Sequence, residues 1–379
     1  MAGIDVHRSD PDKGQILRDK NGRPNGILLE KAMNLVLDVI PEPTVNALAE
    51  TIREAQQSLW AMGITSIHDF DRTTSFRALQ ILHERGQLGL RVHKNLPAEK
   101  LDHIIELGLR SGFGDELLWI GGIKDFADGA LGPQTAAMLE PYQGSPDGNR
   151  GILLVDAEEI VDWGRKAVSA GLSMTIHAIG DRANHEALNA YARIREIEKS
   201  EGINPGRHRI EHVQTIHPED LGRLAELGIQ ASMQPIHQPA DQEAVDAFWG
   251  ERGANSYAWN ALLKSGARLS FGSDAPVETP NPFQGIHAAV NRPRKASAEA
   301  WYPEERISLQ EALQAYTVNP AYVAGKEHEM GKLRAGYLAD LIVLEANPFD
   351  LPQAELSQIQ PLATMLGGNW VWCSERVDF

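Results

Sequence analysis

The chain has 379 residues, 42% hydrophobic and 23% charged, which is enough for one large globular domain with a modest appendage. Its 36 basic and 52 acidic residues give a formal charge of −16, so we expect neither nucleic acid nor an anionic membrane as a partner. The single cysteine, Cys373, excludes an internal disulfide and a cysteine-based zinc site. Because residues 1–14 lack the apolar core of a signal peptide and no run approaches the ~20 apolar residues of a membrane span, we expect a cytoplasmic protein.

Short β-rich runs alternate with helical stretches, the pattern of βα units that build a parallel sheet. Most runs follow a helix that ends in a Gly-containing turn. The seven predicted strands are Thr65–Asp71, Leu90–Leu96, Trp119–Phe126, Ser173–Ile179, Arg209–Gln214, Ile229–Gln234 and Arg268–Asp274. A closed barrel needs eight such units, and residues 1–43 contain no comparable strand. The sequence therefore predicts an α/β fold, a TIM-like (β/α) barrel over residues 1–328 that comprises strands two to eight and lacks the first.

Three further segments have readable patterns. Residues 131–150, rich in Gly and Pro, are predicted to form a loop over the barrel mouth. Ser308 is predicted to cap a helix that Asn319-Pro320 ends. Residues 329–379 contain two predicted strands, in GKLRAGYLADLIVLEANPF and ATMLGGNWVW, which we interpret as the C-terminal part of a small β-sandwich.

Two histidines stand at matching positions, near the C-terminal ends of successive predicted strands. A single histidine such as His177 or His212 on an apolar strand is more often a core residue than a metal ligand. Two in corresponding places favour metal binding, because neutral imidazole is the commonest metal ligand in proteins. The C-terminal ends of barrel strands are also where active sites lie.

A carboxylate and a lysine occupy the same end of two other strands, and each has two interpretations. Asp274 either binds metal and accepts a proton from water, or caps the following helix as a turn residue. Lys124 either pairs with Asp125 or Asp128, or reacts with carbon dioxide to give a carbamate that binds metal. Burial of an unpaired ammonium is costly, so this lysine requires one of these explanations.

Six motifs in this order and spacing resemble the amidohydrolase superfamily, and most closely amidohydrolase family 3, the branch that includes N-substituted formamide deformylase. They are IKDFADGALG, IHAIGDRANHEAL, RHRIEHVQ, ASMQPIH, GSDAPV and GKLRAGYLADLIVLE. The resemblance implies one or two divalent metals, usually zinc. It implies Lys124 as a carboxylated bridging ligand, His177 and His212 as ligands of one metal, and Asp274 as ligand and general base. Gln234 and His237 resemble substrate-facing positions, although both could equally cap the strand.

The sequence departs from the family in one respect. The family's first strand ends in His-x-His, which helps to hold the other metal, and no His-x-His occurs in this chain. His7 and His68 have no histidine two residues away. We therefore expect a chain cut from a longer parent, without the usual ligands of a second metal.

The resemblance implies hydrolysis of a non-peptide C–N bond, of amide or N-formyl type, in a small-molecule substrate through a metal-activated water. Deaminases of the superfamily place a glutamate a few residues after the fifth-strand histidine, where this chain has Gly180 and Asp181, so an amidase is favoured. The alternative is a truncated, catalytically impaired fragment or pseudoenzyme with at most one metal site. An incomplete barrel exposes strand edges that favour association, so a homo-oligomer stays open.

Overall fold

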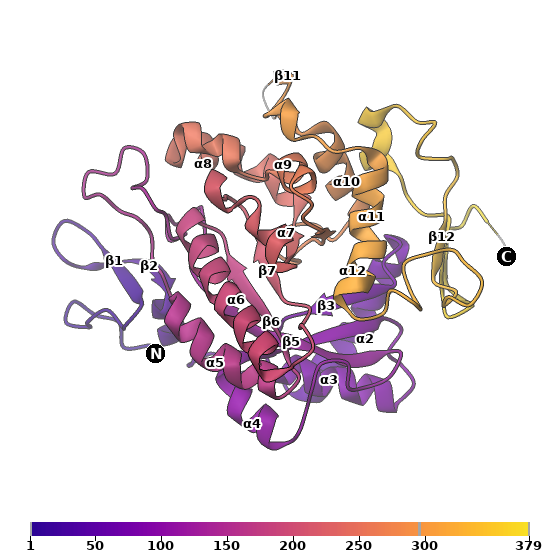
Figure 1. The fold of residues 1–379 in the computed structure, drawn as a ribbon, viewed down its shortest axis with the longest axis horizontal. Coiled ribbons are helices and arrows are strands. Elements are labelled where there is room, and N and C mark those ends of the chain that lie inside the picture. The colour runs from indigo at the N-terminus through magenta and orange to yellow at the C-terminus, as the bar shows by residue number, and fades with distance from the viewer. Residues whose placement is uncertain (1, 295–296, 378–379) are drawn as a thin grey trace.

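A seven-stranded parallel sheet is the centre of the computed structural model, which describes residues 2–294 and 297–377 (Figure 1). Each strand pairs with the next one along the chain, in the order β3 to β9. The strands are β3 (Ser66–Asp69), β4 (Arg91–Pro97), β5 (Leu118–Phe126), β6 (Ser173–Ala178), β7 (Arg209–His212), β8 (Gln230–Met233) and β9 (Leu269–Phe271). These are the seven predicted strands, and the predicted fold class, a barrel one strand short, is confirmed.

Helices precede, connect and follow the strands of this sheet. They are α1 (Asn34–Leu37), α2 (Val45–Ala61), α3 (Thr73–Glu84), α4 (Leu101–Glu106), α5 (Ala157–Ser169), α6 (Asp181–Glu201), α7 (Arg223–Leu227), α8 (Gln238–Phe248), α9 (Trp259–Lys264), α10 (Pro282–Asn291), α11 (Leu309–Tyr316) and α12 (Val318–Val323). The Gly-containing turns act as predicted: α7 ends at Gly228, whose φ of 63° lies in the left-handed region that glycine adopts readily. None of the described helices is both long enough and apolar enough to cross a membrane.

The alternation of side chains along β6 decides which of them reach the candidate site. Met174, Ile176 and Ala178 are fully buried in the apolar core that the helices share with the sheet. Because successive side chains of a strand point to opposite faces, Thr175 and His177 lie on the other face. Strand β7 repeats this arrangement, and in the parallel register His177 stands beside Glu211.

The face of the sheet opposite the helices is polar. Arg209 Nε lies 2.8 Å from Glu211 Oε1, and Arg209 Nη1 donates to His68 Nδ1 at 2.6 Å. Arg209 and Glu211 are only 1% and 4% exposed, so each would be costly to bury without its partner. This ion pair lies beneath the strand ends that carry the candidate site.

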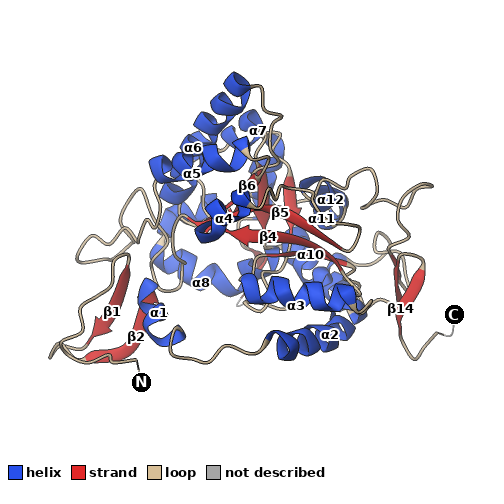
Figure 2. Cartoon of the chain, turned by 90° about the horizontal axis from the view of Figure 1, so that it is seen from below, coloured by secondary structure: helices blue, strands red, loops and turns tan. Residues whose placement is uncertain are grey.

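The N-terminal region contains a β-hairpin that the sequence did not predict. Strand β1 (Gly14–Arg18) pairs antiparallel with β2 (Pro24–Glu30), and the short 3₁₀ helix η1 (Lys31–Met33) follows. The hairpin is not the eighth barrel strand: in the described part of the chain β3 and β9 pair only with β4 and β8. Figures 1 and 2 show it projecting at the end of the molecule opposite the C-terminal sheet.

The C-terminal segment forms a separate three-stranded antiparallel sheet of β12 (Leu341–Val343), β13 (Ala363–Leu366) and β14 (Asn369–Cys373). The prediction of one strand in ATMLGGNWVW was wrong, because Gly367-Gly368, both with positive φ, fold this stretch into a hairpin. Arg91 on β4 holds the sheet to the barrel through two hydrogen bonds to Asp340, at 2.6 and 3.0 Å. Whether this segment is a sandwich remnant stays a prediction.

Two other predicted segments had different outcomes. Residues 131–150 contain neither helix nor strand, so the loop itself is confirmed, and its place over the barrel mouth stays a prediction. Ser308 caps α11 through a capping box with Glu311, also as predicted. The prediction that Asn319-Pro320 ends this helix was wrong: the break is at Thr317, and both residues lie in the first turn of α12, where proline needs no backbone N–H partner.

Candidate metal centre

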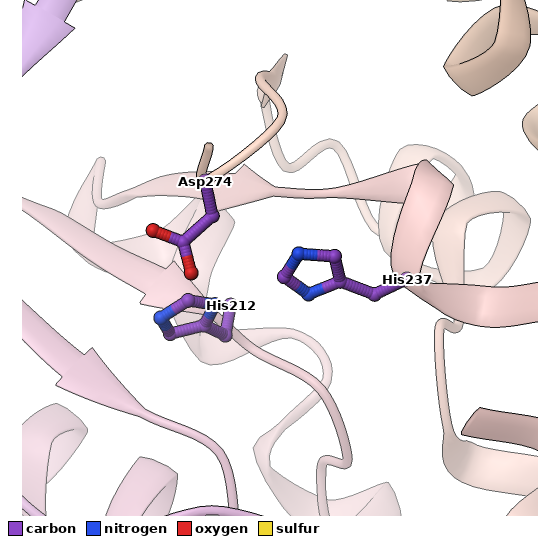
Figure 3. A group of neighbouring side chains, drawn as sticks. All are labelled: His212, His237 and Asp274. Atoms are coloured by element: carbon purple, nitrogen blue, oxygen red, sulfur yellow. The ribbon is translucent and has the colours of Figure 1, made fainter. Parts of the chain in front are cut away.

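Three side chains converge at the C-terminal edge of the sheet, as Figure 3 shows. Each of His212, His237 and Asp274 offers a ligand atom, and these atoms lie within 4.8 Å of one another. His212 ends β7, His237 ends the 3₁₀ turn η4 (Pro235–His237) after β8, and Asp274 follows β9. Three consecutive strands thus bring together residues that are far apart in the sequence, as expected for this edge of a barrel.

His177 stands beside this group, with its ring 4.5 Å from the ring of His212 in an edge-to-face arrangement. Its Nε2 lies 3.0 Å from the carbonyl oxygen of Gly129 and 3.5 Å from Asp128 Oδ1. A proton on Nε2 satisfies this carbonyl and leaves Nδ1 free as a donor atom. Burial, and then the charge of Lys124, lower the pKa of His177 to about 3, so the ring is neutral and suited to bind a cation.

Gln234 fixes the ring of His212. Its Oε1 accepts a hydrogen bond from His212 Nδ1 at 2.8 Å, while its Nε2 donates to the carbonyl of Ser232 at 3.3 Å. Burial, and then the neighbouring His177 and His237, hold the pKa of His212 well below its ordinary value. Because Nδ1 is used as a donor, Nε2 of His212 is left to bind a ligand.

The nitrogen Nε2 of His237 is buried and has no hydrogen-bond partner among the residues that the structure describes. Such a buried polar atom costs stability unless something binds it. Burial lowers the pKa of His237, so the imidazole is neutral. Neutral imidazoles and a carboxylate are the donor set that zinc and similar divalent cations prefer. The residues present therefore fit a divalent metal.

Asp274 and His212 both occupy unusual backbone conformations. Their φ angles are 54° and 77°, and Val213 follows with 42°, in the left-handed region that residues with side chains rarely adopt. Backbone strain of this kind concentrates at functional sites. Desolvation by nearby protein atoms, and then the charge of Glu211, raise the pKa of Asp274 to about 6, although the charge of Lys124 opposes this shift.

Lys124 lies on β5, 7% exposed, and interacts electrostatically with Glu211, Asp125 and Asp274. Its Nζ donates to the backbone carbonyl of Asp125 at 3.0 Å and lies 3.4 Å from the centre of the Phe126 ring. Burial lowers the pKa of Lys124 to about 8, although these three carboxylates oppose the shift. An amine with this pKa is partly unprotonated near neutral pH.

Asp128, considered above as a partner of Lys124, has other partners. Its two carboxylate oxygens accept the backbone N–H groups of Ala137, Ile179 and Gly180 at 2.8, 2.9 and 2.8 Å. It thereby ties the end of β5 to the end of β6 and faces His177. Sequence reasoning missed this role, and the signal was a carboxylate followed by Gly129, two residues after the end of a strand.

The predicted site residues thus lie along one edge of the sheet. His212 and Asp274 belong to the three-residue group, His177 stands against His212, and Lys124 is their electrostatic neighbour. His237, predicted as substrate-facing, joins the group, and Gln234 contacts His212. The assignment of individual roles stays a prediction.

Comparison with known sequences gives concordant matches. The sequence model of a family described as the amidohydrolase family matches residues 1–372. The protein LONG AFTER FAR-RED 3 of Arabidopsis thaliana is 33% identical over 386 residues, which cover 98% of this chain and 65% of that protein. The putative amidohydrolase YtcJ of Bacillus subtilis is 34% identical, with 98% and 70% coverage. N-substituted formamide deformylase of Arthrobacter pascens is 28% identical, with 97% and 69% coverage. The chain therefore spans about two thirds of the length of these relatives.

Solved structures agree in fold. An uncharacterized metal-dependent hydrolase from Pyrococcus horikoshii superposes with a TM-score of 0.75 and 30% identity, over 89% of this chain and 68% of that one. Another from Pyrococcus furiosus gives a TM-score of 0.71 and 32% identity, over 85% and 65%.

Proposed function

The chain belongs to the amidohydrolase family, and from this premise we propose that it hydrolyses a non-peptide C–N bond, of amide or N-formyl type, in a small molecule. The observation that carries the proposal is the convergence of the ligand atoms of His212, His237 and Asp274 within 4.8 Å, with the buried Nε2 of His237 unpartnered in the described part of the chain. We propose zinc as the metal, because imidazole nitrogens and a carboxylate oxygen are its common ligands. The deformylase relative supports the choice of bond.

A bound divalent metal supplies Lewis-acid chemistry, lowering the pKa of water to about 7 and polarising a carbonyl oxygen. The residues of this chain supply the rest. His212, His237 and Asp274 would hold the cation, with His177 beside them. Gln234 keeps the ring of His212 in one orientation by accepting its Nδ1 proton.

Asp274 is the proposed proton carrier. A general base works best when its pKa lies near the working pH, and desolvation by nearby protein atoms, together with the charge of Glu211, raises that of Asp274 to about 6. Its carboxylate would take a proton from the attacking water and return it to the departing nitrogen. The C–N bond then breaks, giving a carboxylic acid and an amine.

Lys124 is the proposed carbamate. The unprotonated amine would attack the carbon of carbon dioxide: a C–N bond forms, the electron pair of one C=O π bond moves to oxygen, and the nitrogen loses a proton. A side chain that is otherwise a cation thereby becomes an anionic oxygen donor. A pKa of about 8 makes the unprotonated amine available near neutral pH. The carbamate would neutralise part of the metal charge within the polar interior of the sheet.

A second candidate function is that of a metal-binding protein without turnover. It is favoured by the open sheet, since β3 and β9 have no further strand partner in the described part of the chain. It also fits the absence of a His-x-His motif from the sequence.

Elemental analysis and a substrate panel separate the two candidates. The purified chain is reconstituted with Zn²⁺, Mn²⁺ or Co²⁺ and dialysed, and its metal content is measured beside hydrolysis of N-formyl amines and simple amides. We expect about one divalent ion per chain together with release of amine. Metal without hydrolysis would support the second candidate, and no metal after reconstitution would overturn both.

A further inference from the structure

The N-terminal hairpin contacts the loop that carries the partner of His177. Glu30, the last residue of β2, accepts a hydrogen bond from Thr135 Oγ1 at 2.6 Å, across 105 residues of sequence. Thr135 is 2% exposed, and its Oγ1 also accepts the backbone N–H of Ala130 at 2.9 Å. Glu30 therefore stabilises a turn whose own backbone is closed by the hydrogen bond from Thr135 N–H to Ala130 O at 3.0 Å.

Gly129 lies between this contact and the candidate site. A Cβ atom at Gly129 would lie 2.2 Å from Glu30 Oε1 and 2.2 Å from Thr135 Oγ1, so the carboxylate packs directly against the glycine backbone. On its other side, the carbonyl oxygen of Gly129 lies 3.0 Å from Nε2 of His177. Glu30, Thr135 and Gly129 thus form a continuous path of contacts that ends on the ring of His177.

Glu30 holds this position in a strained conformation. Its φ of 49° and ψ of −127° are rare for a residue with a side chain. The docking of the hairpin has another anchor: Lys13 Nζ donates to the carbonyl of Leu154 at 2.6 Å and pairs with Glu159 at 3.2 Å. Lys13 already ties the hairpin to the barrel. We therefore interpret the contact of the strained Glu30 as one that stabilises the turn containing Gly129, and not as one needed to dock the hairpin.

We propose that Glu30 is a positioning residue for His177. By holding Thr135 and the turn at Gly129, it keeps the Gly129 carbonyl aimed at Nε2, which places the ring proton there and leaves Nδ1 as the metal-binding atom. Partners that orient a metal-binding histidine in this way commonly raise metal affinity. The inference rests on the proposed function, because it assumes that His177 helps to bind the metal.

The test is a Co²⁺ titration followed by the visible absorption of the bound ion, which reports both affinity and ligand geometry. Glu30→Ala and Thr135→Val each remove the hydrogen bond from one side. We expect each to weaken Co²⁺ binding about tenfold and to alter the spectrum. The double variant should be no weaker than either single one, because both changes break the same contact.

Three matched variants complete the design. Glu30→Gln and Thr135→Ser keep the acceptor and the hydroxyl, so both should bind like the parent. Lys13→Ala removes the other anchor of the hairpin and should leave the Co²⁺ affinity and spectrum unchanged. Thermal melting of every variant identifies any that fail to fold. If the Glu30 variants fail to fold, the Co²⁺ affinities of Thr135→Ser and Thr135→Val are compared instead, because these two differ in the hydroxyl that makes the contact.

The outcomes are distinct. Parent-like Co²⁺ binding by Glu30→Ala, or equal loss in Lys13→Ala, would overturn the positioning role and leave the proposed function intact. Absence of Co²⁺ binding by the parent chain itself would overturn the proposed function, and this inference with it.

Discussion

Gln234 Oε1 accepts a hydrogen bond from His212 Nδ1 at 2.8 Å, and Gln234 is only 6% exposed. The contact fixes the orientation of the ring and leaves Nε2 as the nitrogen available to a ligand. Gln234 therefore acts on His212, whatever further contact it makes with a substrate.

We predict that Gln234→Leu lowers metal affinity about tenfold, because the ring of His212 loses the acceptor that orients it. Gln234→Glu keeps an oxygen at the same place and should retain parent-like affinity. Zn²⁺ affinity measured by competition with a chromogenic chelator checks both variants. Unchanged affinity in Gln234→Leu, with a raised KM instead, would assign Gln234 to the substrate.

His237 has two possible roles that its substitution separates. As a ligand, His237→Ala should reduce the bound metal and kcat together, because one of three converging donors is lost. As a substrate contact, the same change should raise KM and leave the metal content at the parent level. We expect the first result from elemental analysis of protein purified in parallel with the parent. The second result would remove His237 from the metal site.

Lys124→Ala should abolish most metal binding, since it removes the proposed carbamate from the polar interior. Acetate, a small carboxylate that can take the place of the carbamate oxygens, should partly restore it. Metal content after dialysis, with and without about 100 mM acetate, measures the effect. Equal metal content in the variant and the parent, both without acetate, would show that the lysine only pairs with its neighbours.

Acid stability should depend on Glu198, a residue of α6 whose side chain is 2% exposed. Burial alone would raise the pKa of Glu198. Its carboxylate, however, accepts hydrogen bonds from His208 at 3.0 Å, from Gly206 N–H at 2.7 Å and from Arg195 at 2.7 Å. These hydrogen bonds outweigh the effect of burial and lower the pKa from 4.5 to about 2. A depressed carboxylate pKa contributes stability that is fully present above pH 4.5. That contribution is lost as the pH falls from 4.5 through about 2.

Accordingly, Glu198→Gln should lower the free energy of unfolding by about 2 kcal/mol at pH 7. The difference from the parent should shrink progressively below pH 4.5. Urea denaturation across this range provides the measurement, and Glu201→Gln on the same helix, an exposed side chain, is the control with an effect near zero. A Glu198→Gln effect that does not change with pH would contradict the assignment.

The barrel strands were predictable because local signals and tertiary structure agree there. In β6 the alternation of Met174, Ile176 and Ala178 with polar residues is visible in the sequence, and the glycine turns before β8 and other strands mark where each begins. The C-terminal ends of parallel strands must share an edge, so His177 and His212 could be placed together without a structure.

The rest depended on contacts that no local pattern encodes. Strand β2 has no buried residue, so it lacks the alternation that reveals a buried strand, although Asn21-Gly22 in its turn is a hairpin signal that could have been used. His237 follows its strand in a 3₁₀ turn, where the period of two no longer tells which way a side chain points. Glu30 and Thr135 meet across 105 residues, a pairing that only the folded chain determines.

The left-handed backbone at His212, Val213 and Asp274 bears on whether the protein must change its structure to bind a cation. Each such conformation costs about 1–3 kcal/mol, which the packing of the surrounding sheet offsets. The donor atoms are therefore preorganised by folding, unlike those of small metal domains that fold only around their ion. Loading and removal of the cation should leave the circular dichroism spectrum almost unchanged, because the packing of the barrel, and not the cation, holds these three residues in their left-handed conformations.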